Sequence, residues 1–388
     1  MKVAVIYDFS VNKGGGDFVM LNILEALCEA GYDVSLFTSY PNGLQKSADF
    51  FDKPLPKVGI YHVKVPSYLR HPYTIAYVAR RIVEIGNNTY DAYMVSDDVP
   101  RCIAGQKGVC YMHYPHVARF KFKEFIATKY KTTLHGRIAW KIHEILFPSF
   151  YLVNEKPRRW MFIANSIVTR RHAAEVLRIS VEDVVLINPP VAARRINEMW
   201  RNSSSEKENL VVCVGRFEFE KRFTDVLQAL ARLKKKINVR LSLIGFSYDE
   251  KHVFRAIRAL GLEENVELLV NAERRELIDR LLRAKVIVHP APYEPFGIAV
   301  VEGMAAGCIP VIRKGFNGPW LEITQEGRYG IGFSSLRELA GILERAIKYY
   351  DSFNIKAIIS RALEFDEAIF RTRFIKTIEN FTNTSLVS

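Results

Sequence analysis

The sequence predicts an α/β protein made of two domains, each a parallel β-sheet with helices on both faces. Three observations support this prediction. The chain has 388 residues, a length typical of two domains. Short apolar runs typical of buried strands alternate with longer segments of helical periodicity. Apolar residues make up 49% of the chain, which is enough to form sizeable cores.

The first half of the chain follows this alternation from its start. A strand over 3–7 leads through a glycine-containing loop into a helix that ends before Gly31. Further strands are expected over 33–38, 58–65, 91–96, 109–113, 160–165 and 184–187, with helices over 73–85 and 168–177. A proline-containing turn over 188–191 closes this half, so we expect a first domain over 1–191.

The second half repeats the pattern. Residues 192–209 are polar and include consecutive serines, which predicts an interdomain linker. A second domain is expected over 210–364, with strands over 210–214, 239–244, 266–269, 285–289 and 309–313 and helices over 223–235, 253–260, 336–349 and 355–363. The tail over 365–388 is aromatic and basic and is expected to form a further helix.

The cysteines and the apolar runs indicate the cellular compartment of the protein. The five cysteines show no CxxC pair and no regular spacing, which favours a reducing compartment without structural zinc. The chain enters a strand at once and has no signal-peptide core. No run of about 18 apolar residues is present, so no membrane-spanning helix is expected. We therefore expect a cytoplasmic protein.

Basic charge is concentrated in one stretch. The formal net charge is +13, and residues 119–178 alone hold 13 Lys or Arg against 4 Asp or Glu. Basic and aromatic residues interleave over 117–160, a pattern that fits a helix lying in a membrane interface. We favour this interpretation over a nucleic-acid surface, which the same pattern could also form. The pattern also fits an α-hairpin with aromatic residues facing the core. Candidate membrane or acceptor contacts are Arg119, Lys121, Lys123, Trp140, Arg158 and Arg159.

One stretch of the second half organises the predicted site. A buried strand over 285–289 leads through a proline-rich turn into a helix that opens near Gly297. The N-terminus of a helix offers free backbone N–H groups and a positive dipole end, which suits a phosphate. Glu294 precedes this helix and Glu302 lies within it, so their carboxylates could hold hydroxyls of two sugar rings. The alternative is a buried strand–turn–helix unit with two incidental glutamates.

This stretch resembles the E-x7-E signature of retaining glycosyltransferases of family 4. The residues that match are Glu294-Pro295-Phe296-Gly297, Glu302, Ala305-Ala306-Gly307 and Ile309-Pro310-Val311. Gly215, Arg216 and Lys221 are similar to the family's G-R-x4-K motif. The resemblance implies the GT-B fold, in which two Rossmann-like domains face an interdomain cleft and a C-terminal helix crosses back to the N-terminal domain.

The resemblance also implies roles for individual residues. The second domain would bind a nucleotide-sugar donor and the first an acceptor. Glu302 would hold the ribose, Glu294 the transferred hexose, and Arg216 with Lys221 the diphosphate. Further expected donor contacts are Gly15, Gly16, Gly245, Asn271, Ala272, Phe296, Gly297 and Ile298. The family usually has a glycine where Val270 stands, which leaves the nucleobase open.

His113 lies within Tyr111-Met112-His113-Tyr114-Pro115, which resembles a motif of lipid-linked-oligosaccharide α-1,2-mannosyltransferases. The resemblance implies that His113 contacts the donor sugar, that the donor is GDP-mannose, and that the acceptor is a polyprenyl-diphosphate glycan at the cytoplasmic membrane face. A UDP-sugar transferase with a soluble acceptor, or an inactive binding module, are the alternatives. The chain has no D-x-D tripeptide, so we expect no metal and no cofactor besides the sugar nucleotide.

Overall fold

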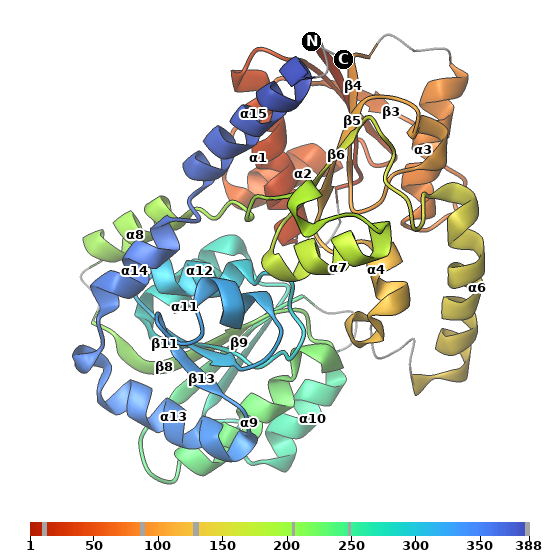
Figure 1. Ribbon diagram of the computed structural model, residues 1–388. Coiled ribbons are helices and arrows are strands. Elements are labelled where there is room, and N and C mark those ends of the chain that lie inside the picture. Colours follow the sequence, from red (N-terminus) through yellow and green to blue (C-terminus); the bar gives the residue numbers. More distant parts are fainter. Residues whose placement is uncertain (10–13, 86–89, 127–131, 204–205, 247–249, 385–388) are drawn as a thin grey trace. The chain divides into compact units, whose positions relative to one another are not determined.

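The computed structural model describes residues 1–9, 14–85, 90–126, 132–203, 206–246 and 250–384 (Figure 1). They divide into two compact units. The first unit comprises Met1–Pro190 and the C-terminal segment from Ala368, and the second comprises Val191–Glu367. Each unit contains one parallel sheet with its own hydrophobic core. Within the described residues, none of the helices is both long and apolar enough to cross a bilayer.

The first unit is built on a seven-stranded sheet in which every pair of neighbouring strands is parallel, in the order β3-β2-β1-β4-β5-β6-β7. Its strands are β1 (Lys2–Ile6), β2 (Asp33–Thr38), β3 (Gly59–His62), β4 (Ala92–Ser96), β5 (Gly108–Met112), β6 (Trp160–Ala164) and β7 (Val184–Leu186). The central strands are buried almost throughout, which explains their continuous apolar sequence.

Helices connect these strands and cover both faces of the sheet. They are α1 (Gly15–Glu29), α2 (Gly43–Phe51), α3 (Tyr73–Glu84), α4 (His116–Lys121), α6 (Leu134–Phe150) and α7 (Ile167–Leu177), with short turns η1 (Arg101–Ile103), η2 (Lys123–Phe125) and η3 (Val181–Asp183). In Figure 1, α1 lies on one side of the strands and α3 on the other. The predicted arrangement of a parallel sheet between helices is therefore confirmed.

The C-terminal helix α15 (Glu367–Thr384) packs onto the first unit, as the sequence predicts. Phe370, Phe374 and Ile378 recur every four residues and are buried, so they form one apolar stripe along the helix. Beside this stripe, the Arg371 guanidinium donates to Asn22 Oδ1 at 3.2 Å and Glu25 Oε2 at 2.9 Å, both on α1. Figure 1 shows α15 alongside α1.

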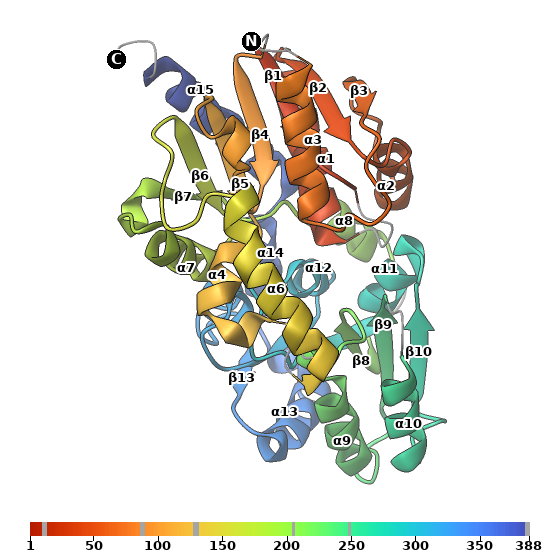
Figure 2. The same cartoon turned by 90° about the vertical axis from the view of Figure 1, so that its right-hand side faces the viewer.

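The second unit contains a six-stranded parallel sheet in the order β10-β9-β8-β11-β12-β13. Its strands are β8 (Glu208–Val214), β9 (Arg240–Gly245), β10 (Val266–Val270), β11 (Ala284–His289), β12 (Ile309–Arg313) and β13 (Ile331–Phe333). Its helices are α8 (Ala193–Asn202), α9 (Phe223–Leu233), α10 (Lys251–Ala259), α11 (Arg274–Arg283), α12 (Ile298–Ala305), α13 (Leu336–Lys348) and α14 (Ile355–Leu363), with the turns η4 (Phe219–Lys221), η5 (Pro319–Ile323) and η6 (Tyr350–Ser352). Figure 2 gives the view turned by 90°.

The prediction of a polar linker over 192–209 is wrong for most of its length. Residues 193–202 form the helix α8, and β8 begins at Glu208, two residues before the predicted start of the second domain. Ala193 and Ile196 are buried in the core of the second unit, and the Asn197 amide donates to Ala305 O at 3.1 Å. The one-sided spacing of these residues supports a helix, although its other face is charged.

Lys207, immediately before β8, forms hydrogen bonds to the ends of two helices of the second unit. Its ammonium group donates hydrogen bonds to Leu281 O at 3.2 Å, Ala284 O at 2.8 Å and Ala306 O at 2.6 Å. These three carbonyls lie at or near the ends of α11 and α12, where helices leave carbonyl groups without intrahelical partners. One side chain therefore caps two helix ends.

We expect Lys207→Met to destabilise the protein by about 2–4 kcal/mol, because it removes three hydrogen bonds to helix-end carbonyls, two of which keep only the weak thiol donor of Cys308. Urea unfolding would measure the change. Lys285→Met is the matched control: its ammonium group donates to Asn209 Oδ1 and Ile347 O on a more exposed part of the surface, and we expect a loss below about 1 kcal/mol. Equal losses in the two variants would contradict the assigned role of Lys207.

Candidate active site

The loop between β11 and α12 depends on two glycines, one for its backbone conformation and one for a close contact between backbone segments. Gly297 is the N-cap of α12 and has a φ of +98°, a left-handed conformation that favours glycine. A Cβ atom there would lie 2.8 Å from Pro319 Cγ, and one on Gly318 would lie 2.0 Å from Pro295 O. Gly318 N–H also donates to Glu294 O at 2.8 Å. This close packing fixes Glu294 just before the N-terminus of α12.

Glu294 forms an ion pair with Lys221, which comes from η4 after β8. The side chains are only 15% and 19% exposed, respectively. Burial is the largest influence and would raise the pKa of the Glu294 carboxyl. Attraction by Lys221, His289 and Arg216, together with the hydrogen bond from Lys221, outweighs it and holds that pKa below its ordinary value. The carboxylate is therefore ionised at neutral pH, and the structure brings together two residues that are 73 positions apart.

His289 stands beside this pair and was not predicted as a site residue. Its Nε2 atom is buried, lies 3.6 Å from Glu294 Oε2, and has no hydrogen-bond partner within the part of the chain that the structure describes. Burial lowers the pKa of His289 to about 4 despite the neighbouring carboxylate, so the imidazole is neutral at pH 7. Its position at the C-terminal end of a parallel strand could have identified it from the sequence.

Glu302 lies on α12 and is 5% exposed. Arg274, at the start of α11, donates from Nη2 to Glu302 Oε1 at 2.5 Å. The sequence reading identified Glu302 but missed Arg274, although Arg274 follows the predicted nucleobase loop by only two residues. This ion pair fixes the direction of the Glu302 carboxylate before any ligand is present.

The remaining predicted donor contacts differ in character. The side chain of Arg216 is 64% exposed and approaches Glu218, with a closest distance of 3.4 Å. A Cβ atom on Gly245 would lie 1.7 Å from Gly215 O, so this glycine permits β9 to approach the loop after β8. Asn271 has a φ of +56° and donates its N–H to Gly245 O at 2.7 Å. Gly245 and Asn271 thus build the backbone around the site.

In the first unit, His113 lies at the C-terminal end of β5, opposite the start of α1. Its Nε2 atom is buried and has no hydrogen-bond partner among the described residues. A Cβ atom on Gly16 would lie 3.6 Å from His113 Nε2 and 3.3 Å from Tyr7 Oη, so a glycine here leaves room beside both polar atoms. Gly15 and Gly16 open α1, and residues 10–13 of the predicted glycine loop lie outside the described residues.

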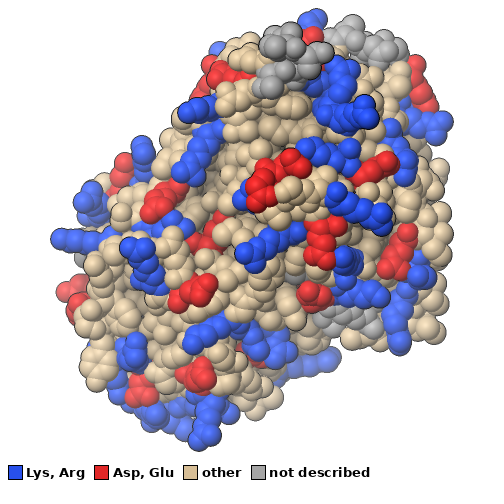
Figure 3. All heavy atoms as spheres, in the orientation of Figure 1, with Lys and Arg blue, Asp and Glu red and all other residues tan. Residues whose placement is uncertain are grey.

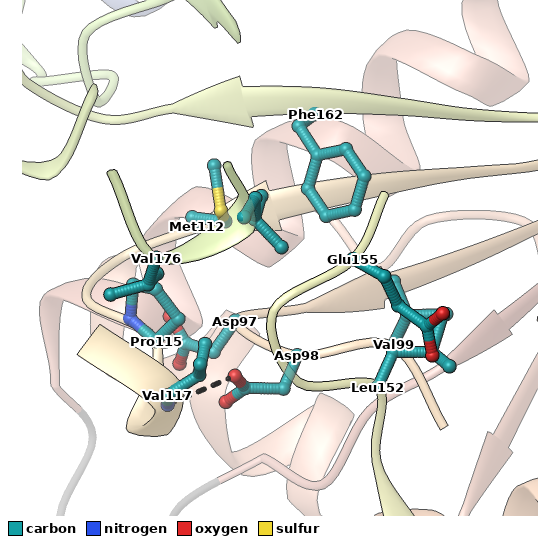
Figure 4. A pocket seen from close by; sticks show the side chains of 11 residues that line it. Asp97, Asp98, Val99, Met112, Pro115, Val117, Leu152, Glu155, Phe162 and Val176 are labelled. Carbon is teal, nitrogen blue, oxygen red and sulfur yellow. Dashed lines mark hydrogen bonds between the residues drawn. The ribbon is translucent and has the colours of Figure 1, made fainter. Parts of the chain in front are cut away.

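Two aspartates after β4 hold the loop that follows His113. Asp97 Oδ1 accepts the N–H groups of His113 at 2.7 Å and Tyr114 at 2.9 Å. Asp98 accepts the N–H groups of His116 at 2.8 Å and Val117 at 3.3 Å, the second of which Figure 4 shows at the edge of a small, mainly apolar cavity. Burial raises the pKa of Asp98 to about 6. Both carboxylates therefore position the loop backbone.

The predicted membrane or acceptor residues separate into two groups. Lys123, Arg158 and Arg159 are exposed, and Lys121 pairs with Glu175 at 2.5 Å on the surface. Trp140 instead packs inward against Phe120 and His143, and the Arg119 guanidinium lies over Tyr114, with 5.8 Å between guanidinium and ring centroid. Basic residues 129 and 131 lie outside the described residues.

The arrangement defines a fold class. Two parallel α/β units and a C-terminal helix returning to the first unit are features of the GT-B fold. The fold is also found in solved structures: sucrose-phosphate synthase from Thermosynechococcus elongatus has a TM-score of 0.72 at 15% identity, covering 99% of this chain and 100% of that one. A glycosyltransferase from Rickettsia africae gives 0.69 at 14% identity, covering 98% of both chains.

The family model of the glycosyl transferases group 1 matches residues 194–349, which include most of the second unit. A GDP-Man:Man(3)GlcNAc(2)-PP-Dol alpha-1,2-mannosyltransferase from Dictyostelium discoideum is 25% identical over 312 residues, covering 73% of this chain and 61% of the relative. A GDP-mannose:cellobiosyl-diphosphopolyprenol alpha-mannosyltransferase from Xanthomonas oryzae is 32% identical over 120 residues, covering 30% and 31%. The chain thus spans about three fifths of the Dictyostelium relative, and 40% of a Neurospora crassa relative with the same name.

We expect Gly297→Ala to destabilise the protein by at least about 1–2 kcal/mol, because alanine is strained at positive φ and its Cβ would meet Pro319. Gly341→Ala is the control. This glycine lies inside α13 with open space around it, so alanine should stabilise the protein by about 0.5–1 kcal/mol. Thermal unfolding would measure both changes, and a neutral Gly297→Ala would contradict the proposed constraint on the loop.

Proposed function

We propose that this protein transfers mannose from GDP-mannose, with retention of configuration, to a glycan linked to a polyprenyl or dolichyl diphosphate. The observation that carries the proposal is the Lys221–Glu294 ion pair at the N-terminus of α12, with Glu302 held by Arg274 further along that helix. The relatives named as GDP-mannose transferases acting on diphosphate-linked lipids support the choice of donor and acceptor.

Stabilisation of the leaving diphosphate is the main task of the site. An ammonium group has three donors, so Lys221 can contact Glu294 and a phosphate oxygen together. Arg216 is exposed and can turn towards the same group, and the first N–H groups of α12 point towards its N-terminus. Positive charge placed where negative charge develops lowers the barrier to breaking the glycosidic bond.

The two glutamates would hold the sugars. Because Glu294 is ionised, it can accept hydrogen bonds from hydroxyl groups of the transferred mannose. Glu302, whose direction is fixed by Arg274, would accept from the ribose hydroxyls. The neutral His289 can donate to or accept from Glu294 or the sugar without adding charge. In the first unit, His113 Nε2, which has no hydrogen-bond partner in the part of the chain that the structure describes, is available for a sugar hydroxyl.

A nucleic-acid function has less support. On the face drawn in Figure 3, Lys and Arg are interspersed with Asp and Glu and form no continuous basic stripe. The acceptor would instead be a glycan lipid, reached at the cytoplasmic face of a membrane by the first unit.

The decisive experiment measures GDP release from GDP-mannose with and without a diphosphate-linked lipid glycan, alongside a panel of UDP-sugars. Release that depends on both GDP-mannose and the lipid glycan would support the proposal. Release from a UDP-sugar alone would replace the donor and acceptor assignment while retaining the site. Absence of release from every donor would favour a binding protein with the same fold.

We expect Lys221→Ala and Glu294→Gln each to lower kcat about 100-fold or more, because each removes one charge of the site. Steady-state kinetics would show this, and circular dichroism would confirm that both variants fold. The control variants Lys236→Ala and Glu344→Gln break a more exposed ion pair in the same unit, where the closest atoms are 3.1 Å apart, and should retain wild-type rates. Wild-type rates in the site variants would overturn the residue assignment.

We also expect turnover to survive an excess of EDTA with little change. The charges of Lys221 and Arg216 and the N-terminus of α12 can take the role that a divalent ion has in other transferases. The same GDP-release assay, run with EDTA and again after adding Mg²⁺ or Mn²⁺, would measure this. Loss of activity with EDTA and its return with one metal would contradict the prediction.

A further inference from the structure

Helix α6 carries an aliphatic stripe on its solvent-facing side. Leu134, Ile138, Ile142 and Ile145 are 66%, 50%, 51% and 66% exposed, and Leu146 beside them is 46% exposed. Their spacing of four, four and three residues places the first four along one side of a helix. A surface helix of a globular protein normally shows the opposite pattern, with its apolar side facing the core.

A different set of residues attaches α6 to the first unit. Phe147 is fully buried and stacks on Tyr151, with 4.6 Å between ring centroids. His143 Nδ1 and Tyr73 Oη are 2.8 Å apart. Phe147 follows Ile138 by nine residues, about 900° of helical rotation, and so lies on the opposite side. The aliphatic stripe is therefore not needed to hold the helix in place.

The charges around the stripe are mainly positive. Arg137 and Lys141 lie along its edge, and the one carboxylate on the helix, Glu144, pairs with Lys141 at 3.1 Å. The surrounding stretch over 119–178 has 13 basic and 4 acidic residues. An apolar stripe flanked by cations matches the surface of a bilayer with anionic headgroups, where cations meet phosphates and aliphatic groups meet acyl chains.

The residue types favour a bilayer over a protein partner. Binding sites for proteins are dominated by Trp, Tyr and Arg, whereas Leu and Val are under-represented at their energetic centres. On α6, Trp140 and Phe147 point inward, and Phe150, which is 43% exposed, packs against Tyr73. The outward stripe itself consists of branched aliphatic residues. Such a surface is suited to a partner without specific shape, such as a layer of acyl chains.

We propose that the outward face of α6 (Leu134, Ile138, Ile142, Ile145 and Leu146, flanked by Arg137 and Lys141) is a membrane-docking surface that lies in the interface of an anionic bilayer. The inference rests on the proposed function in that a lipid-linked acceptor requires the enzyme to meet a membrane. It goes further by assigning that contact to one helix face and to aliphatic residues that the sequence reading did not select.

The test measures binding of the full chain to phosphatidylcholine vesicles with and without phosphatidylglycerol, without sugar nucleotide or acceptor. We expect wild-type protein to float with the anionic vesicles and Ile138→Ser/Ile145→Ser to bind at least ten-fold more weakly. The matched control, Leu55→Ser/Ile85→Ser, removes two exposed aliphatic residues elsewhere in the same unit and should bind like wild type. Ile142→Trp should bind more tightly, since tryptophan favours the bilayer interface.

Several results would overturn the proposal. These are a wild-type protein that does not bind vesicles, equal losses in the two serine double variants, or a loss of self-association in Ile138→Ser/Ile145→Ser without loss of vesicle binding. The last result would assign the face to a second copy of the chain. Vesicle binding is measured without a donor, so it is independent of the GDP-release assay. Vesicle binding without GDP release would refute the proposed function alone, and GDP release without vesicle binding would refute the docking surface alone.

Discussion

The ion pair between Lys221 and Glu294 is the interaction on which the rest of the candidate site depends. A buried charge without a partner is costly, and the ion pair gives both side chains an opposite charge inside the protein. The pair also joins the loop after β8 to the loop after β11, two neighbouring central strands of the sheet. His289, held neutral beside the pair, lets the site remain compact without a further buried charge.

Close approach of backbone to backbone makes this pairing possible. Gly245 lets the end of β9 reach Gly215, and Gly318 lets the turn before η5 rest on Pro295. A side chain at Gly245 would displace the loop that carries Lys221, and one at Gly318 would displace the loop that carries Glu294. The site therefore depends on residues that have no chemistry of their own, and their positions fix the geometry of the charged groups.

The sequence predicted the strands of the first sheet and all but β13 of the second, because a buried parallel strand needs a continuous apolar run. The edge strand β13 has only three residues, one of them a glycine, and shows no such run. The family resemblance singled out Lys221, Glu294 and Glu302, and the structure pairs Lys221 with Glu294 and Arg274 with Glu302. The helix α8 was missed because only one narrow side is apolar, and Arg274 because an arginine near a helix start is normally solvated. The buried environment of His289 follows from side chains distant in sequence, which no local pattern records.

For the segment around α6, composition identified a candidate membrane surface but selected the wrong residues for it. Aromatic residues drew attention to Trp140, yet the structure turns Trp140 and Phe147 inward and leaves the isoleucines outside. Composition does not show which side of a helix a residue faces. The angular position of that residue around the helix axis, relative to the buried Phe147, does show it. A helix fixed to its unit on one side and aliphatic on the other can hold an enzyme at a bilayer without distorting its fold. Confinement to the same surface as a lipid-linked acceptor would raise the effective concentration of that acceptor, so modest membrane affinity is enough to favour the reaction.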